Sequence, residues 1–530
     1  MLSRILSAAT IGIEAKPIEI EVDITRGLPS VVIVGLPDTA IRESRDRVKA
    51  AIKNSQFEYP AEKITINLAP CDIKKEGPSF DLPIAIGILA ASGQIDFNSL
   101  KDCVFLGELA LNGKIRPIKG ALPIAMSLKN SHKKLILPEE NGHEASIVEG
   151  VETYPVSTLG NICNFLNGLN KIDPLSPTKE MLKENRQNYD LDFSDVKGQF
   201  LAKRAMEIAS AGNHNIIMIG PPGSGKTMLA KRLPTIIPEM TIEESLETTK
   251  IHSVSGLIPA KGSIIRTRPF RTPHHTASDI SLVGGGTIPK PGEVSLAHNG
   301  VLFMDELPEF HRNVLEGLRQ PLEDGYVTIS RINSIMRFPS KFMLVCAMNP
   351  CKCGHYGDLK SSCRCTPNEL QRYRSRISGP LLDRIDIHIE VPSVKYKELV
   401  DISPCESSAQ IRERVKKARD IQLERFKDGG IFCNAHMSHK QIRKYCKLGQ
   451  KEQDLLKMAM SELNFSARAY SKILKIARTI ADIEESENIN ADHIAEAIQY
   501  RSLDRDIFFL YIKDGVELFL CFSISMYLFA

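Results

Sequence analysis

IIMIGPPGSGKT, residues 216–227, is a short apolar strand that runs into a glycine-rich turn. The turn has the spacing of a phosphate loop, in which backbone N–H groups point at a triphosphate that bulky side chains would block. The predicted nucleotide contacts are Gly220, Pro221, Pro222, Gly223, Ser224, Gly225, Lys226 and Thr227. Lys226 would reach the β- and γ-phosphates, and the Thr227 hydroxyl would ligate Mg²⁺. ATP and Mg²⁺ are therefore the expected cofactors.

A second apolar strand, VLFM at residues 301–304, ends in the acidic pair Asp305 and Glu306. In a phosphate-loop enzyme, Asp305 would hold the Mg²⁺ and Glu306 would orient or deprotonate the attacking water. The phosphate-loop pattern also arises by chance in proteins that bind no nucleotide. The strand before the loop and the acidic pair after the second strand favour ATP hydrolysis.

Short apolar strands alternate with helical segments through the middle of the chain. The strands are expected at residues 216–219, 301–304, 342–347 and 385–391. This alternation predicts an α/β fold with a doubly wound parallel sheet. An alternating segment at residues 325–337 predicts a β-hairpin just before the third of these strands.

A chain of 530 residues is long enough for about three or four domains. Short apolar strands mixed with helical periods, at residues 39–54 and 81–91 for example, predict an α+β domain in the N-terminal part. Charged helical segments at residues 408–426 and 466–485 predict a helical lid. The predicted boundaries are 1–170 for the N-terminal domain, 171–192 for a polar linker, 193–392 for the nucleotide domain, 393–505 for the lid and 506–530 for an apolar tail.

Composition excludes some classes of protein. With 42% hydrophobic and 25% charged residues the chain is an ordinary globular protein, and a net charge of +4 means that any nucleic-acid interface must be local. The first residues lack a cleavage-like site, so we expect no secretory signal. The apolar run after Glu517 is about thirteen residues, shorter than the ~20 that span a bilayer, so a packed or disordered extension is favoured over a membrane anchor.

Four of the twelve cysteines lie in the segment CKCGHYGDLKSSCRC, residues 351–365. Cys351, Cys353, Cys363 and Cys365 form two C-x-C pairs around a nine-residue loop, which suits four thiolates on a tetrahedral Zn²⁺. The more common pairs are C-x₂-C, so unliganded thiols or a redox pair remain alternatives, and His355 is a spare ligand. Clustered thiols with the rest scattered indicate a reducing, cytoplasmic location.

Four further strings resemble AAA+ ATPases. DVKGQ, residues 195–199, resembles the adenine-side element of that class. Asn349, at the end of FMLVCAMNP, stands where these proteins carry a polar sensor that positions the lytic water. Arg384, in GPLLDRIDIHIEV, stands at the place of the arginine finger, and Arg468, in FSARAYSK, at that of the second sensor. Guanidinium groups suit these roles because they neutralise phosphate charge. The alternatives are pairing of Arg384 with a neighbouring aspartate and solvation of Arg468.

A glycine- and proline-rich segment, residues 266–300, and the predicted hairpin resemble the helix-2 insert and presensor hairpin of the AAA+ branch that contains replicative helicases and magnesium chelatase. In a ring these elements project toward the pore. The candidates for gripping a phosphate backbone are Arg266, Arg268, Arg271, Lys290 and Arg331. The alternative is that the arginines brace the insert within the ring.

The strings RTPHHTASDISLVGGGTIPKPGEVSLAHNGVLFMDELPEF and CRCTPNELQRYRSRISGPLLDRIDIHIEV resemble the magnesium-chelatase-like ComM/YifB family across about residues 1–505. The resemblance implies a homo-oligomeric ring, a hexamer, that acts on single-stranded or branched DNA. It implies branch migration during recombination of incoming DNA in natural transformation, with recombination proteins as partners and no membrane contact. A metal-chelatase ATPase subunit and an ATP-dependent protease or unfoldase remain alternatives.

The family's first domain is similar to the protease domain of Lon. EGPSFD, residues 76–81, is similar to the segment with Lon's nucleophilic serine, which implies Ser79 as its counterpart. Leu122 stands where Lon has its lysine base, and Lys119 lies three residues earlier. A serine without a placed base is not activated. We therefore expect a proteolytically inert domain that serves as a scaffold or a nucleic-acid-binding ring.

Overall fold

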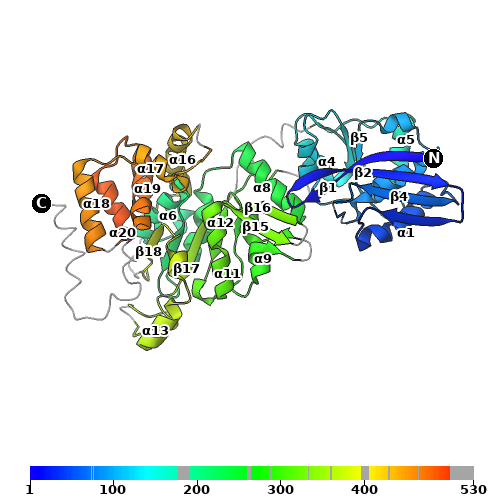
Figure 1. The fold of residues 1–530 in the computed structure, drawn as a ribbon. Coiled ribbons are helices and arrows are strands. Elements are labelled where there is room, and N and C mark those ends of the chain that lie inside the picture. Colours follow the sequence, from blue (N-terminus) through cyan, green and yellow to red (C-terminus); the bar gives the residue numbers. More distant parts are fainter. Residues whose placement is uncertain are drawn as a thin grey trace.

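The computed structural model describes residues 1–501 except 73, 76, 177–189, 259–263, 287–288, 332–333, 358–360, 395–404, 428–429 and 464. Three regions follow one another along the molecule: an N-terminal α/β region, a central α/β region and a helical C-terminal region (Figure 1). The predicted tail and most of the predicted linker lie outside the described residues. Among the described residues, no helix combines the length and apolar character needed to cross a bilayer.

The N-terminal region is built on a seven-stranded mixed sheet in the order β3-β4-β2-β1-β5-β8-β9. Its strands are β1 (Leu2–Ile11), β2 (Glu14–Thr25), β3 (Ser30–Val34), β4 (Lys63–Ala69), β5 (Cys103–Phe105), β8 (Lys134–Pro138) and β9 (Glu152–Val156). The pairs β1–β2 and β2–β4 are antiparallel, and the other pairs are parallel. A separate small hairpin joins β6 (Glu108–Leu109) to β7 (Ile115–Arg116).

Five helices accompany this sheet: α1 (Thr39–Asn54), α2 (Asp81–Ala91), α3 (Ala121–Ser127), α4 (Glu139–Ser146) and α5 (Leu159–Leu166). Helix α1 begins where the Asp38 carboxylate accepts a hydrogen bond from Ile41 N at 2.8 Å, an ordinary N-cap. Every residue of α2 is buried, as its apolar sequence on all sides requires. The helices predicted at residues 39–54 and 81–91 are confirmed.

The central region contains a five-stranded sheet in the order β11-β14-β17-β10-β18. The strands are β10 (Ile216–Ile219), β11 (Phe270–Arg271), β14 (Val301–Met304), β17 (Met343–Met348) and β18 (Ile387–Glu390), and all pairings are parallel. Successive residues of β10 enter two different buried clusters, Ile216 and Met218 on one face and Ile217 and Ile219 on the other. Both faces are therefore covered, which confirms the predicted doubly wound parallel sheet.

The helices and smaller strands around this sheet are α6 (Phe200–Gly212), α7 (Lys226–Arg232), α8 (Ile242–Ser255), α9 (Asp279–Val283), β12 (Gly284–Gly285), β13 (Lys290–Pro291), α10 (Glu293–Leu296), α11 (Arg312–Gly317), α12 (Arg319–Asp324), α13 (Pro367–Arg374) and α14 (Gly379–Leu382). The hairpin predicted before β17 is confirmed as β15 (Tyr326–Arg331) and β16 (Ser334–Pro339), paired antiparallel.

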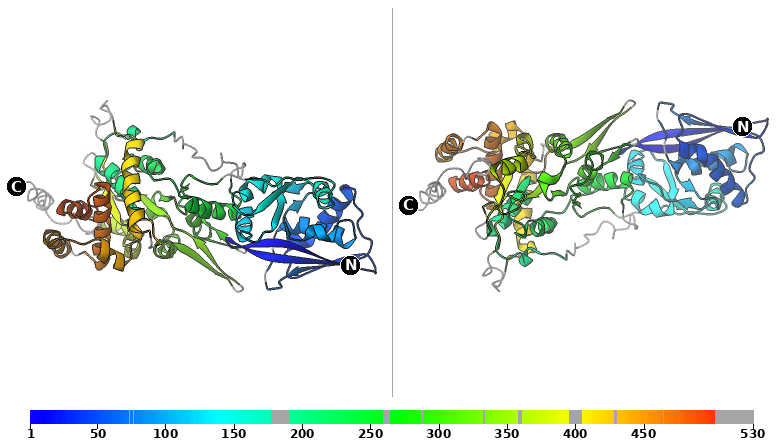
Figure 2. Two further views of the ribbon diagram at one scale, coloured as in Figure 1. Left: turned by 90° about the horizontal axis from the view of Figure 1, so that it is seen from above. Right: turned by 90° about the horizontal axis from the view of Figure 1, so that it is seen from below.

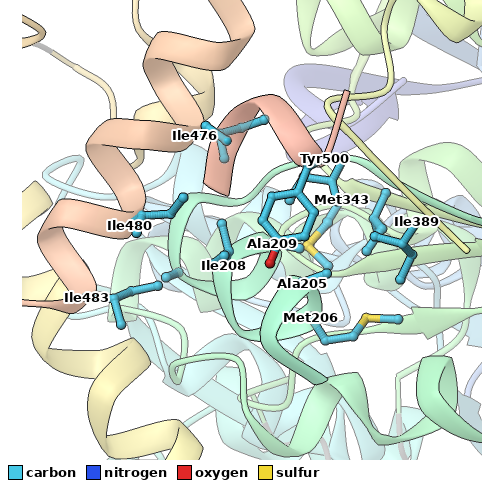
Figure 3. Packing of buried hydrophobic residues seen from close by; sticks show 14 of the residues in the cluster. Ala205, Met206, Ile208, Ala209, Met343, Ile389, Ile476, Ile480, Ile483 and Tyr500 are labelled. Atoms are coloured by element: carbon cyan, nitrogen blue, oxygen red, sulfur yellow. The ribbon is translucent and has the colours of Figure 1, made fainter. Parts of the chain in front are cut away.

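The C-terminal region is helical: α16 (Ser408–Arg425), α17 (His439–Tyr445), α18 (Gln450–Glu462), α19 (Ala467–Ile483) and α20 (Ala491–Gln499). Ile476, Ile480 and Ile483 on α19 share one buried cluster with Ala205, Ile208 and Ala209 on α6 (Figure 3). Spacings of three and four residues place the α19 side chains on one face of the helix. The helical region therefore packs firmly against the central sheet region.

Within the described part of the chain, the N-terminal region contacts α8 and β16 of the central region, which lie beside it in Figures 1 and 2. Ser253 on α8 donates its hydroxyl to the buried Glu144 carboxylate on α4, and Gly120 N donates to Ser253 O at 3.2 Å. Met336 on β16 lies against Gly12 in the turn between β1 and β2. Both contacts fall on elements outside the parallel sheet.

Candidate nucleotide-binding site

The phosphate loop connects β10 to α7 and needs its glycines for two physical reasons. Gly223 and Gly225 have φ of 74° and 94°, a region that residues with a Cβ rarely adopt. At Gly220 a Cβ atom would lie 2.1 Å from Val391 O, so that position admits no side chain. The loop predicted from sequence is thus a tight backbone turn, built where strand β10 ends.

Lys226 opens helix α7, and its ammonium group lies inside the loop. Its Nζ atom donates to Gly220 O at 2.7 Å and Pro221 O at 2.9 Å, and lies 3.3 Å from Asn349 Oδ1. Burial lowers the pKa of Lys226, and the nearby Asp305 carboxylate opposes this shift. Asn349 directly follows β17, the strand beside β10. The structure therefore brings the loop lysine and the predicted polar sensor together.

Thr227, in the first turn of α7, and Asp305, directly after β14, form a hydroxyl–carboxylate pair. Thr227 Oγ1 donates to Asp305 Oδ2 at 2.8 Å, and Asp305 Oδ1 accepts from Glu306 N at 3.0 Å. Oxygen ligands from one hydroxyl and one carboxylate suit Mg²⁺, which binds protein through few groups and phosphate oxygens. The two residues predicted as magnesium ligands fit that ion.

Glu306 follows Asp305 with a φ of 52°, an unusual value for a residue with a side chain. Its side chain is 57% exposed, and the carboxylate oxygen Oε2 lies 3.6 Å from His275 Nδ1. His275 comes shortly after β11, a two-residue strand that the sequence did not predict. The adjacent histidines in RTPHHT were the signal that could have drawn attention to this neighbour.

Arg384 and Arg468 line one cavity, and they do not lie in the phosphate-loop cluster. Arg384 is paired with Glu323 at 2.6 Å and donates to Pro380 O at 2.6 Å, and Arg468 lies 3.5 Å from Asp383. Both arginines line a cavity of about 810 Å³ beside the helical region, and its described lining includes no residue of the phosphate loop. The partner of Arg384 is Glu323 and not one of the neighbouring aspartates.

Two of the predicted DNA-gripping arginines have intramolecular partners. Arg268 donates to Asn299 O at 2.7 Å and pairs with Glu244 at 3.0 Å, and Arg271 pairs with Glu293 at 2.6 Å. Hydrogen bonding to Glu293 raises the pKa of Arg271. For these two residues the geometry favours bracing of the insert.

The remaining cationic candidates differ in exposure. Lys290 is exposed and Arg266 is half-buried, whereas the side chain of Arg331 lies outside the described part of the chain. Lys290 and Arg266 therefore remain the described candidates for contact with a phosphate backbone.

The four predicted zinc ligands converge. Their sulfur atoms all lie within 4.8 Å of one another, with Cys351–Cys353 at 3.3 Å, Cys353–Cys363 at 3.6 Å and Cys351–Cys363 at 3.7 Å. A tetrahedral zinc with bonds of about 2.3 Å places its sulfurs ~3.8 Å apart, so the cluster fits this ion. Hydrogen bonding from the backbone at His355 lowers the pKa of Cys353 to about 6. A thiolate, the form that binds metals, is thereby favoured at Cys353, whereas burial raises the pKa of the Cys351, Cys363 and Cys365 thiols.

The cysteine loop also touches the phosphate loop. Gly354 has a φ of 84°, and a Cβ atom there would lie 2.6 Å from the Pro222 ring. The same loop begins two residues after Asn349. A structural change in the cysteine cluster would therefore alter the packing of Gly354 on Pro222 and, through it, the phosphate loop.

The candidate protease residues of the N-terminal region have other contacts. The Lys119 side chain packs over Gly256, at the end of α8. Leu122 is buried, and its backbone N–H donates to Glu144 at 3.0 Å. In the same segment, Asp81 is buried and paired with Arg47 at 2.8 Å. These contacts fit a structural role for the region.

The central region carries a phosphate loop, an acidic residue pair and a polar residue after β17 on one parallel sheet. A helical region follows it, and this combination fits the magnesium-chelatase-like class. Three family models match: "Magnesium chelatase, subunit ChlI" at residues 192–399, "Subunit ChlI of Mg-chelatase" at 20–141 and "Magnesium chelatase, subunit ChlI C-terminal" at 405–501. The chain belongs to the ComM/YifB family of magnesium-chelatase-like proteins, as the following relatives show.

The chain is 48% identical to "Competence protein ComM" of Haemophilus influenzae over 95% of its own length and 98% of that protein. It is 44% identical to "Uncharacterized protein YifB" of Escherichia coli, again over 95% and 98% of the two chains. The chain is 22% identical to the "Magnesium-chelatase 38 kDa subunit" of Rhodobacter capsulatus, over 57% of this chain and 84% of that protein.

Proposed function

We propose that the protein is an ATP-driven ring motor that acts on DNA. The observation that carries the ATPase part is the cluster of Lys226, Thr227, Asp305 and Asn349 on neighbouring elements of one parallel sheet. The geometry is that of a phosphate-loop enzyme, in which positioning and charge stabilisation do most of the catalytic work. Family membership supports ATP and Mg²⁺ as the cofactors.

Each residue of the cluster has a defined part in the proposed hydrolysis. Lys226 would exchange its loop carbonyls for the β- and γ-phosphate oxygens, and Asn349 would orient the water. Thr227 and Asp305 would hold Mg²⁺, which supplies charge neutralisation when bound. Glu306 would accept the proton of the attacking water as the water oxygen bonds to the γ-phosphorus and the ADP oxygen leaves.

The position of Arg384 and Arg468 supports a ring. They lie in a cavity that is separate from the phosphate loop of their own chain, so their guanidinium groups would serve a nucleotide held by the next copy. A head-to-tail contact of this kind closes into a ring when the rotation permits, and we propose a hexamer. Arg384 is the proposed finger and Arg468 the second sensor.

DNA is the proposed substrate, single-stranded or branched, and branch migration during recombination of incoming DNA is the proposed outcome. The name of the Haemophilus relative, a competence protein, supports a part in natural transformation, with recombination proteins as partners. Lys290 and Arg266 on the insert, together with Arg331 on the hairpin, are the proposed contacts to the phosphate backbone. Such a protein would work in the cytoplasm, where its clustered thiols stay reduced.

The remaining parts of the chain have proposed supporting roles. The N-terminal region is proposed to be a Lon-like scaffold without proteolytic activity, supported by the packing of Lys119 on Gly256. The four cysteines are proposed to bind one structural Zn²⁺. Holding their loop against Pro222 would stabilise the phosphate loop.

The direct test measures ATP hydrolysis by the purified protein without DNA and with single strands, duplex, a fork and a four-way junction. We expect strong stimulation by DNA, greatest with the branched forms. An unchanged rate with every DNA would contradict the DNA proposal and favour a protein substrate or a chelatase partner. Lys226→Ala in parallel establishes that the measured hydrolysis belongs to this protein.

A further inference from the structure

The backbone segment that carries Arg384 is anchored to the parallel sheet by Asn215, the residue before β10. Asn215 Nδ2 donates to Arg384 O at 3.1 Å, and Asn215 Oδ1 accepts from Leu344 N, on β17, at 2.8 Å. The backbone carbonyl of Asn215 also accepts from Asp386 N at 2.9 Å. One amide side chain therefore links the backbone at Arg384 to the strand beside β10.

The same segment is anchored to the helical region by Lys472 of α19. Lys472 Nζ donates to Ile385 O at 3.0 Å and pairs with Asp386 Oδ1 at 2.9 Å. The side chains of Lys472 and Asp386 are only 15% and 12% exposed. Burial opposes ionisation of Asp386, but the Lys472 ammonium holds the pKa of this carboxyl well below its usual range. A largely buried ion pair is stable only with a well-defined geometry, so this pair fixes the backbone next to Arg384.

Helix α19 also carries Arg468, one turn before Lys472. Arg468 lies 3.5 Å from Asp383, the residue before Arg384. Residues four positions apart share one face of a helix. The helix therefore contacts the chain immediately before and immediately after Arg384. It is itself firmly placed, since its isoleucines pack against α6 (Figure 3).

The anchored segment leaves the Arg384 guanidinium with an unused donor. Its side chain is 13% exposed, and Arg384 Nε has no hydrogen-bond partner in the described part of the chain. An unsatisfied donor on a largely buried group costs free energy, which an acceptor from another copy would recover. The buried Arg501 guanidinium also donates to Ile385 O and, at 3.2 Å, to Asp386 O. Of these anchors, Lys472 is the one on the helix that carries Arg468.

We propose that Lys472 is a positioning residue for Arg384 and Arg468. It fixes the segment of Arg384 to the helix of Arg468, so that both guanidinium groups meet the nucleotide of the next copy as one unit. Lys472 acts through Ile385 and Asp386. This inference deepens the proposed function and rests on it, because it takes the two arginines as groups that serve a neighbouring copy.

The first test compares Lys472→Met and the double variant Lys472→Met/Asp386→Asn with the parent protein. The double variant removes both members of the ion pair, so that no uncompensated buried charge is left. In both variants ATP hydrolysis with branched DNA should fall by about ten-fold or more, because a small displacement of a catalytic group is enough. The Kd for ATP should stay within about two-fold, since the phosphate loop of the same chain is intact. Lys417→Met removes an exposed lysine that pairs with Glu485 in the same helical region, and this matched control should behave as the parent.

Mixed assemblies separate positioning of the arginines from general damage to the chain. Lys472→Met keeps Glu306 intact, and Glu306→Gln keeps both arginines anchored. Mixed in equal amounts, these variants should hydrolyse ATP well above the mean of the separate proteins, because about a quarter of the head-to-tail contacts then join two intact halves. Lys472→Met mixed with Arg384→Ala should show no such gain, since neither chain presents a correctly placed Arg384.

The inference is overturned if both Lys472 variants hydrolyse ATP at the parental rate, or if both lose ATP binding. It is also overturned if Lys472→Met gains activity with Arg384→Ala and not with Glu306→Gln, because that pattern places the defect in the nucleotide site of its own chain. The mixture of Glu306→Gln with Arg384→Ala tests the proposed function separately. A gain there, with none for Lys472→Met and Glu306→Gln, contradicts only the role of Lys472, whereas no gain there contradicts the proposed ring and this inference with it.

Discussion

The phosphate-loop cluster and the cavity of Arg384 and Arg468 differ in what one chain supplies to them. In the first, Lys226, Asn349 and the Thr227–Asp305 pair meet at the ends of adjacent strands. In the second, two arginines lie beside acidic groups of their own chain, with no described residue of the loop among their neighbours. Under the proposed ring, one copy would carry two halves of a reaction centre, and a second copy would complete it.

The largest effect on ATP hydrolysis is expected when the lysine of the phosphate loop is removed, which tests the first of the two sites. Lys226→Ala should lower ATP hydrolysis by about 100-fold or more and weaken ATP binding, because the charge that meets the β- and γ-phosphates is lost. Hydrolysis and binding of a fluorescent ATP analogue would be measured together. Lys231→Ala, on the exposed side of the same helix α7, is the matched control and should retain both properties.

The proposed role of the Arg384 and Arg468 cavity is tested by Arg384→Ala. Hydrolysis should fall by about 100-fold while ATP binding by each copy is retained, because the guanidinium acts on charge that develops in the reaction. Arg376→Ala, another arginine paired with a glutamate of the central region, is the control. Equal loss of nucleotide binding in Arg384→Ala would place this arginine in the site of its own chain and contradict the two-halves interpretation.

A smaller effect on ATP hydrolysis is expected from changes in the cysteine cluster. They test whether this cluster supports the phosphate loop. Zinc analysis of the purified protein should give one metal ion per chain. Cys353→Ser should lose it, lower the thermal midpoint and raise the KM for ATP a few-fold, because the loop packs on Pro222. Cys71→Ser, at an exposed cysteine of the N-terminal region, is the control. Metal-free protein with unchanged stability and KM would exclude a structural zinc.

The smallest effect is expected at the contact between the N-terminal and central regions. Ser253→Ala removes a donor from the buried Glu144 carboxylate, whose pKa burial raises. A hydrogen bond to a charged group contributes about 1.5–3 kcal/mol. The first unfolding midpoint should therefore fall by roughly 3–12 °C. Ser255→Ala is the control, since its hydroxyl donates within α8, to Ile251 O. Equal midpoints for the two variants would show that Ser253 does not stabilise the contact.

The sequence predicted the phosphate loop and Asp305 because their chemistry is local: each stands at the end of an apolar strand, and parallel strands bring such ends together. Asn349 was predicted from its resemblance to the polar sensor of AAA+ ATPases. It did not predict β11, whose two residues carry too little periodicity, and the neighbour of Glu306 was missed with it. The acidic partners of Arg268 and Arg271 could not be predicted from the sequence either. Glu244 and Glu293 lie more than twenty residues away in the chain, and only the folded insert brings them together.

The most direct test of the two-halves claim mixes two inactive variants, Glu306→Gln and Arg384→Ala, at equal amounts. Co-purification through a tag on one of them establishes that mixed assemblies form. A copy with intact Glu306 then meets a neighbour with intact Arg384 at about a quarter of the contacts in a head-to-tail ring, and hydrolysis should recover to a corresponding fraction of the parental rate. Mixed assemblies no more active than the separate variants would contradict the account.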